Sequence, residues 1–198
     1  LRDAMWTSML AALLGAAPAG PSIPPSATEA YAQVLERNVE DGLVDYARLA
    51  RKDLPRLERF LDAVAEADLP ASKNARVGIL VDAYNALVLR SVIRHDIPSS
   101  VLDVDGFFDE ETHRVAGRDL TLDVLEKRVL GPLAQDARLH FVLVCAAKGC
   151  PILERAPYSG SDMDARMEAA ARRYVRSPAG ARVVGEDLQL SKIFQWYA

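Results

Sequence analysis

Apolar positions recur every three to four residues along several stretches of the chain, which is the spacing of one helix face. The longest stretch predicts a buried central helix from Lys73 to Arg94, because apolar residues surround most of its circumference. The same period predicts further helices at Ala27–Val39, Asp53–Ala67, Thr121–Leu130 and Ser161–Val175.

Local signals give these helices predicted ends. Ser26 and Glu29 have the spacing of a capping box, and Ser72 is placed to cap the central helix. Gly131-Pro132 is expected to end the helix that Thr121 begins. Pro151 favours the first position of a helix, which would make Cys150 its N-cap.

Strands are predicted where short apolar stretches flank turn residues. Thr112–Val115 and Arg118–Leu120 surround Ala116-Gly117, and Ala181–Val184 and Leu188–Leu190 surround residues 185–187. The run Leu139–Val144 is apolar except for His140, which predicts a buried strand. The fold class is therefore α+β, with helices packed on a small, mainly antiparallel sheet.

The first 25 residues differ from the rest. Arg2 precedes an apolar run, Met5–Ala17, and Ala17-Pro18-Ala19 resembles a signal-peptide cleavage site. The run is too short to span a bilayer stably. We expect residues 1–25 to be a signal-like segment with a linker and the protein to be exported, to the periplasm or outside the cell. An ordinary amphipathic or buried helix at residues 3–14 is the alternative. Residues 26–198 form the predicted single domain.

The composition of the chain excludes some classes of binding partner. The 198 residues are 50% hydrophobic, enough for one core, and the formal charge of −4 comes without a basic run, which excludes nucleic acid as a partner. The sequence contains no glycine-rich phosphate loop, so no cofactor is expected. The three histidines are scattered, so no metal site is expected, although zinc shared by His140, Cys145 and Cys150 is an alternative.

The densest group of reactive residues lies between Arg138 and Pro151. His140 and Cys145 supply an imidazole and a thiol, which are the groups of nucleophilic sulfur chemistry. They are five positions apart, so on a regular strand they point to opposite faces and meet only if the strand bulges or ends before Cys145. A helix N-terminus and Lys148 would lower the pKa of Cys150. Inert core cysteines, a structural histidine or a disulfide are the other interpretations.

A second polar group lies on the central helix. Asp82 and Asn85 are three residues apart and share a face, whereas Tyr84 points elsewhere. Buried polar groups need partners, so these residues either hold a neighbouring loop or line a site. Glu126 is either an inward carboxylate or a solvated one.

These residues also carry a resemblance to the family called domain of unknown function 547. The blocks Asp82–Leu87 and His140–Cys145, the latter followed by Gly149-Cys150-Pro151, resemble its Asn-Ala-Tyr-Asn-Ala and His-Phe…Cys…Cys-Pro elements. Asp41–Tyr46, Leu120–Leu122 with Glu126, and Lys192–Tyr197 resemble three supporting elements in the same order, from about Tyr31 to Ala198.

The chain departs from this pattern at several positions. Asp82 stands where the family usually has Asn, and Val144 and Ala147 replace a usual Asn and Ser beside Cys145. The family pattern continues beyond Ala198 into an Asp-Phe segment and a further helix, so we expect the usual C-terminal end to be missing. The family's layout resembles the papain-like and transglutaminase-like superfamily, whose nucleophile lies on the central helix, where this chain has no thiol.

The resemblance and the residues together imply a thiol-dependent hydrolase or acyl transferase that acts on a peptide or a small thiol peptide such as glutathione. Cys145 is the expected nucleophile, His140 the base, and Asn85 the third catalytic residue. The expected substrate-binding residues are Asp82, Tyr84, Glu126, Arg138 and Cys150. A non-catalytic module that binds a ligand or partner outside the cytoplasm is the alternative, and the oligomeric state is left open.

The spacing of the cysteines predicts that they can form a disulfide. Only four residues separate Cys145 from Cys150, and Gly149 lets that loop bend. Such a loop can bring the two α-carbons within the 4.4–6.8 Å or so that a disulfide needs. Because loop entropy grows with length, a bridge here adds little stability and is expected to be regulatory or protective.

Overall fold

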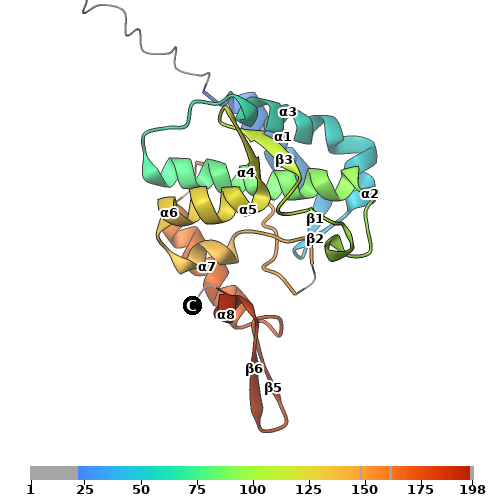
Figure 1. Cartoon of the computed structure of the whole chain (residues 1–198), viewed down its shortest axis with the longest axis vertical. Helices are drawn as coiled ribbons and strands as arrows, with labels where there is room; N and C mark the ends of the chain where they lie inside the picture. Colours follow the sequence, from blue (N-terminus) through green and yellow to red (C-terminus); the bar gives the residue numbers. More distant parts are fainter. Residues whose placement is uncertain (1–21, 148, 161, 197–198) are drawn as a thin grey trace, which may run out of the picture.

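The computed structural model describes residues 22–147, 149–160 and 162–196. The expected signal-like segment lies almost wholly outside these residues. Figure 1 shows a long helix, α4 (Lys73–Arg94), running through the middle of the molecule with the other elements around it. Most residues of α4 from Val77 to Val92 are buried, as its apolar pattern predicts.

Two helices cover one side of α4. They are α1 (Pro25–Asn38) and α3 (Leu54–Ala65), joined through α2 (Tyr46–Arg48) and the π-helix η1 (Leu49–Asp53). The rings of Tyr31 on α1 and Phe60 on α3 stack with centroids 4.5 Å apart, and both side chains are fully buried. This aromatic pair fixes the two helices against each other.

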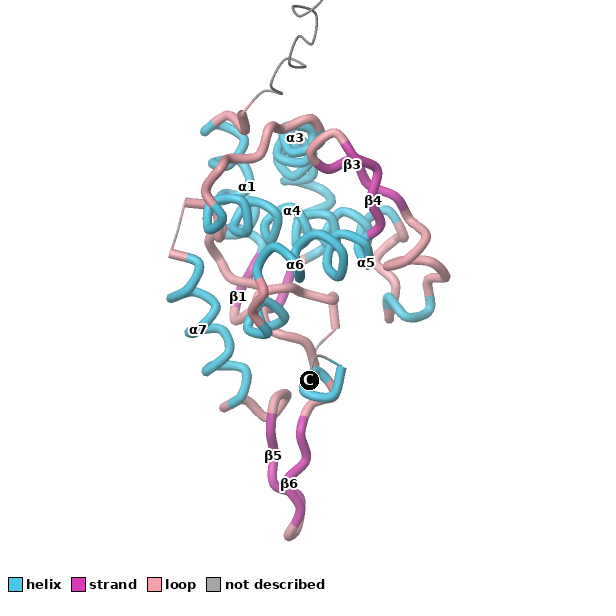
Figure 2. The backbone as a smooth tube through the Cα atoms, turned by 60° about the vertical axis from the view of Figure 1, so that its left-hand side comes forward, coloured by secondary structure: helices cyan, strands magenta, loops and turns pink. Residues whose placement is uncertain are grey.

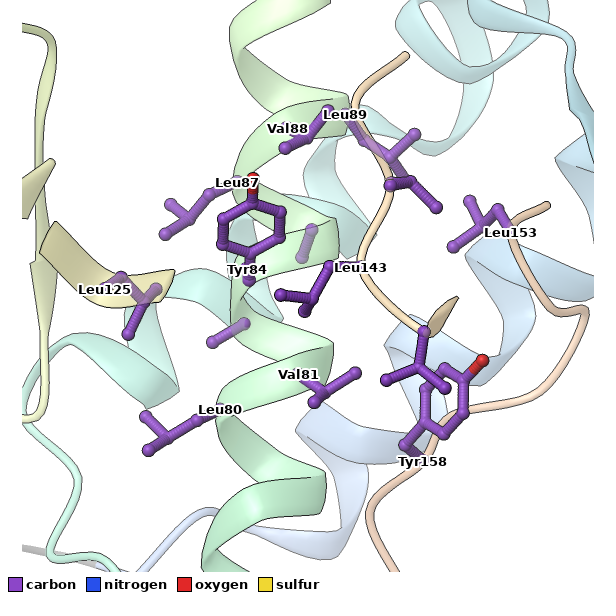
Figure 3. Close-up of a cluster of buried hydrophobic side chains, with 14 of the residues drawn as sticks. Leu80, Val81, Tyr84, Leu87, Val88, Leu89, Leu125, Leu143, Leu153 and Tyr158 are labelled. Carbon is purple, nitrogen blue, oxygen red and sulfur yellow. The ribbon is translucent and has the colours of Figure 1, made fainter. Parts of the chain in front are cut away.

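One longer helix, α7, and several short helical segments make up the rest of the described helical structure. They are the 3₁₀ turn η2 (Val101–Asp103), α5 (Leu122–Val124), the π-helix η3 (Leu125–Leu130), α6 (Gly131–Ala134), the 3₁₀ helix η4 (Ala137–Phe141), α7 (Met163–Val175) and α8 (Ile193–Trp196). Figure 3 shows part of the core they enclose: side chains of α4 lie between Leu125 on one side and Leu143 and Leu153 on the other.

The strands form antiparallel pairs: β1 (Val39–Glu40) with β2 (Leu43–Val44), β3 (Thr112–Val115) with β4 (Arg118–Thr121), and β5 (Ala181–Val184) with β6 (Asp187–Leu190). The last two pairs confirm the predicted hairpins, and the α+β class is confirmed. The β5–β6 hairpin projects away from the body in both views (Figures 1 and 2).

The predicted strand at Leu139–Val144 is wrong. Residues 137–141 form η4, which begins where the Asp136 side chain accepts a hydrogen bond from the backbone N–H of Arg138. Residues 142–144 then run without a strand partner. A short apolar run does not distinguish a strand from another buried segment, and here the side-chain cap at Asp136 favours a helical turn.

Several predicted helix ends are also wrong. Pro25 occupies the first turn of α1, so the helix begins before Ser26 and the predicted capping box does not form. Pro132 lies in the first turn of α6 rather than ending the helical stretch. Residues 151–154 are not helical, so Cys150 is not an N-cap. The cap of α7 is Asp162, and the predicted cap Ser161 lies outside the described residues. Among the described helices, none has the length and apolar character to cross a bilayer.

Candidate functional site

Asn85 holds the backbone that joins His140 to Cys145. Its amide nitrogen donates to the carbonyl oxygen of Val142 at 3.0 Å, and its amide oxygen accepts from the N–H of Val144 at 3.0 Å. Asn85 is 1% exposed. One side chain of α4 thus satisfies a carbonyl and an N–H group of this segment, so the segment stays buried without a sheet.

The adjacent residue on α4, Tyr84, is linked to His140 by hydrogen bonds through Glu126. The Tyr84 hydroxyl donates to Oε2 of Glu126 at 3.1 Å, and Oε1 of Glu126 lies 3.2 Å from Nδ1 of His140. The His140 and Glu126 side chains are 15% and 11% exposed. The three residues come from α4, η3 and η4, so the fold brings together Tyr84, Glu126 and His140 from distant parts of the sequence.

This arrangement defines which nitrogen of His140 can act as a base. When Nδ1 carries the hydrogen that it donates to the Glu126 carboxylate, Nε2 keeps its lone pair and can accept a proton. The carboxylate also stabilises the imidazolium that results. Glu126, rather than Asn85, therefore occupies the position of a group that orients the imidazole.

Cys145 and Cys150 form a disulfide, with their α-carbons 6.2 Å apart. The prediction that the two sulfurs lie close enough to bridge is confirmed. The loop between them turns where Ala146 adopts a φ of 56° and the Cys150 N–H donates to the Ala147 carbonyl at 3.0 Å. The Tyr174 hydroxyl of α7 donates to the Gly149 carbonyl at 2.8 Å and anchors the loop from outside.

Asp82 holds a different loop. Its two carboxylate oxygens accept from the backbone N–H groups of Tyr158 and Ser159 at 2.7 and 2.8 Å. Burial raises the pKa of Asp82 to about 6, against the lowering effect of these hydrogen bonds and of the Arg166 charge. Gly78, one turn earlier on α4, leaves room for the same loop, because a Cβ there would lie 3.0 Å from the Tyr158 carbonyl oxygen.

Arg138 belongs to an ion-pair cluster that joins η4 to α7. Its guanidinium contacts Asp136 at 2.7 Å, Asp164 at 2.6 Å and Glu168 at 3.0 Å. Hydrogen bonds from Arg138 lower the pKa values of Asp136 and Glu168, and those to the three carboxylates raise the pKa of Arg138. These contacts fix the start of the segment that carries His140.

A cleft of about 340 Å³ lies along the disulfide loop. Its described lining residues come from the β1–β2 region, α4 and both sides of the loop: Gly42, Leu43, Val44, Tyr46, Leu89, Val144, Ala146, Ala147, Pro151 and Leu153. The sequence alone did not predict this cleft. The feature that could have indicated it is the Asp41–Tyr46 element of the family resemblance, because four of the lining residues belong to that element. Within the described ranges, no group of three or more His, Cys, Asp or Glu side chains could hold a metal ion.

The fold and site define an α+β protein with a partly buried Glu–His pair close in sequence to a short disulfide loop. Its family follows from comparison with known sequences: residues 70–175, more than half of the chain, match the model of the family described as "Protein of unknown function, DUF547", and the chain belongs to this family. The match contains Tyr84, Asn85, Glu126, His140 and both cysteines. No curated protein and no solved structure matches the chain. The papain-like relationship therefore stays a prediction.

Proposed function

We propose that the protein is a thiol-dependent hydrolase or acyl transferase in which Cys145 is the nucleophile and His140 the base. The observation that carries this proposal is the 3.2 Å contact between Glu126 and His140. It provides an oriented imidazole five residues before a cysteine, on backbone that Asn85 holds in place. A base that is oriented by a third group is one of the established ways to activate a thiol.

The disulfide makes the described form a resting state. Two molecules of a small thiol, or one dithiol, would reduce the Cys145–Cys150 bond to two thiols and become a disulfide themselves. His140 Nε2 would then take the proton of the Cys145 thiol, and the thiolate would attack the carbonyl carbon of an acyl donor.

Transfer of the acyl group to and from Cys145 requires no cofactor. A bond forms between Cys145 Sγ and the carbonyl carbon, the bond from that carbon to the leaving group breaks, and His140 returns its proton to the leaving group. Water completes a hydrolysis, and an amine or thiol completes a transfer. Either acceptor breaks the thioester and gives its proton to His140, and Cys145 is regenerated as a thiolate beside the imidazolium.

Iodoacetamide labelling of a Cys150→Ser variant across pH tests this proposal, because that variant leaves Cys145 as the one thiol of the chain. The expected result is an alkylation pKa for Cys145 well below the ordinary value of about 8.5. The double variant with His140→Ala should return the pKa toward that value. An ordinary pKa in both variants would remove the basis for thiolate chemistry.

A non-catalytic binding module is the second candidate, and the cleft favours it. An apolar cleft beside a closed disulfide can bind a peptide or small thiol without any chemistry. Measurement of turnover distinguishes the two candidate functions. A binding module releases no product in any redox state, and it keeps its ligand affinity after Cys145→Ala. Export of the domain, which the first residues suggest, is part of both proposals.

A further inference from the structure

We propose that the cleft beside the disulfide loop binds an aliphatic acyl chain, so that the substrate class is an apolar acyl ester or thioester rather than a charged peptide such as glutathione. This inference rests on the proposed function for its chemistry, and on the cleft itself for its binding. None of the ten described lining residues is charged, and the Tyr46 hydroxyl is the one polar side-chain group among them.

The described lining carries no charged side chain, and this favours uncharged ligands. Glutathione carries two carboxylates and an ammonium group, and removing a charge from water costs several kcal/mol or more unless it is paired. The described lining provides no such partner. An aliphatic chain gains from the same surroundings, at about 0.8 kcal/mol for each buried methylene.

The cleft borders the disulfide loop, and its described lining includes direct sequence neighbours of both cysteines. Val144 immediately precedes Cys145, Ala146 and Ala147 belong to the loop, and Pro151 follows Cys150. A chain in the cleft therefore lies against the segment that carries the reactive sulfur. Because Asn85 binds the Val144 N–H, this wall of the cleft is tied to α4 rather than to a free loop.

The volume of the cleft limits the length of the acyl chain that it can hold. A volume of about 340 Å³ holds on the order of ten groups the size of a water molecule, each about 30 Å³, and a methylene is close to that size. We therefore expect the benefit of chain length to stop near ten carbons. A larger cavity of about 670 Å³ includes Glu29 and Asp68 in its lining and none of the described residues between 138 and 151, so it is not the expected acyl site.

A chain-length series of p-nitrophenyl esters, from acetate to decanoate, tests the inference on the reduced protein, with Cys145→Ala as the blank. We expect kcat/KM to rise up to about fourfold for each added methylene, the equivalent of about 0.8 kcal/mol. The variant Leu43→Asp places a charge in the lining at a residue that is 63% exposed and so leaves the core intact. The same change at Leu102, which is 84% exposed and is not among the lining residues, is the matched control.

The outcomes separate the inference from the proposed function. A slope that flattens in Leu43→Asp and persists in Leu102→Asp supports the inference; a flat wild-type series, or an unchanged slope in Leu43→Asp, overturns it. If no ester is turned over, the proposed function fails, and calorimetric titration of 1-decanol into the oxidised protein decides the inference. Binding that Leu43→Asp weakens at least tenfold supports an acyl site, and absence of binding overturns it.

Discussion

Nδ1 of His140 lies 3.2 Å from Oε1 of Glu126, although the two residues are 14 positions apart in the sequence and each comes from a different short helix. The contact is largely shielded from water, and the second carboxylate oxygen is held by Tyr84. The carboxylate is therefore fixed on one side by α4 and directs its other oxygen to the imidazole. This contact fixes the orientation of the His140 imidazole, which the proposed role of a base requires.

Glu126→Gln should lower kcat/KM for acyl release by about 10² to 10³-fold, because the imidazole loses the charge that orients it and stabilises its protonated form. Tyr84→Phe is the matched control. It removes a partner of Glu126 and leaves the contact between Glu126 and His140, so its effect should stay within about tenfold. Initial rates of ester cleavage by the reduced proteins measure both. Unchanged rates in Glu126→Gln would show that the pair has no catalytic role.

Asn85→Ala should destabilise the fold by about 2–4 kcal/mol. It leaves a buried carbonyl at Val142 and a buried N–H at Val144 without their partners, and each unsatisfied group costs about 1–3 kcal/mol. Urea unfolding measures the change. Asn74→Ala on the same helix is the control, since Asn74 is exposed and its replacement should stay within about 0.5 kcal/mol of wild type. Equal stabilities for the two variants would contradict the described role of Asn85.

The stability difference between wild type and Asp82→Asn should depend on pH. Burial raises the pKa of Asp82 from 3.8 to about 6, so between these values the folded state binds the proton more tightly than the unfolded state. The contribution of Asp82 to stability is therefore largest below pH 4 and is lost as the pH rises toward 6. The loss is on the order of 3 kcal/mol, at about 1.4 kcal/mol per pKa unit.

The quantity to measure is the difference in the free energy of unfolding between wild type and Asp82→Asn. The wild-type value alone is not sufficient, because the titration of His113 changes stability with pH in the opposite direction. Burial lowers the pKa of His113 to about 4; the charge of Glu111 opposes this shift, and the charges of Arg90 and Arg94 add to it. The contribution of His113 to the stability of the fold is therefore lost as the pH falls below 6.5. That effect is common to both proteins and cancels. Denaturant unfolding at pH 4, 5, 6 and 7 gives the difference, and parallel stability curves would contradict a raised pKa at Asp82.

The sequence predicts the parts of the fold that depend on local signals. The period of apolar residues from Lys73 to Arg94 locates α4, and the turn residues Ala116-Gly117 locate one hairpin, because these features are set by neighbouring residues. It fails at residues 139–144, where the hydrogen-bond partner is Asn85, more than 50 residues away. Composition cannot show whether a buried backbone is paired by a strand or by one side chain.

The sequence indicates which residues belong to the candidate site but not which of them contact one another. His140, Glu126, Tyr84 and the two cysteines stand out in the sequence as polar or reactive groups in apolar surroundings. Their arrangement depends on how η3 and η4 pack on α4, which no local pattern specifies. For the same reason the sequence suggested Asn85 as the third catalytic residue, whereas Glu126 contacts the imidazole and Asn85 binds backbone.

Untreated protein should contain no free thiol and should gain two after reduction, which mass spectrometry with alkylation reads directly. Loss of the bridge should cost about 2 kcal/mol or less, since it closes a very short loop. Cys150→Ser should be active without a reductant, whereas wild type should require one. Two free thiols in air-exposed wild type would contradict a resting disulfide.

The most direct test of the account is to trap the acyl intermediate. Reduced protein is mixed with p-nitrophenyl hexanoate, quenched in acid and digested, and the hexanoyl group is located by mass spectrometry. We expect a thioester on Cys145 that hydroxylamine removes, that is absent in Cys145→Ala, and that forms at least 100-fold more slowly in His140→Ala. Acylation that spares Cys145, or that proceeds at the same rate without His140, would contradict it.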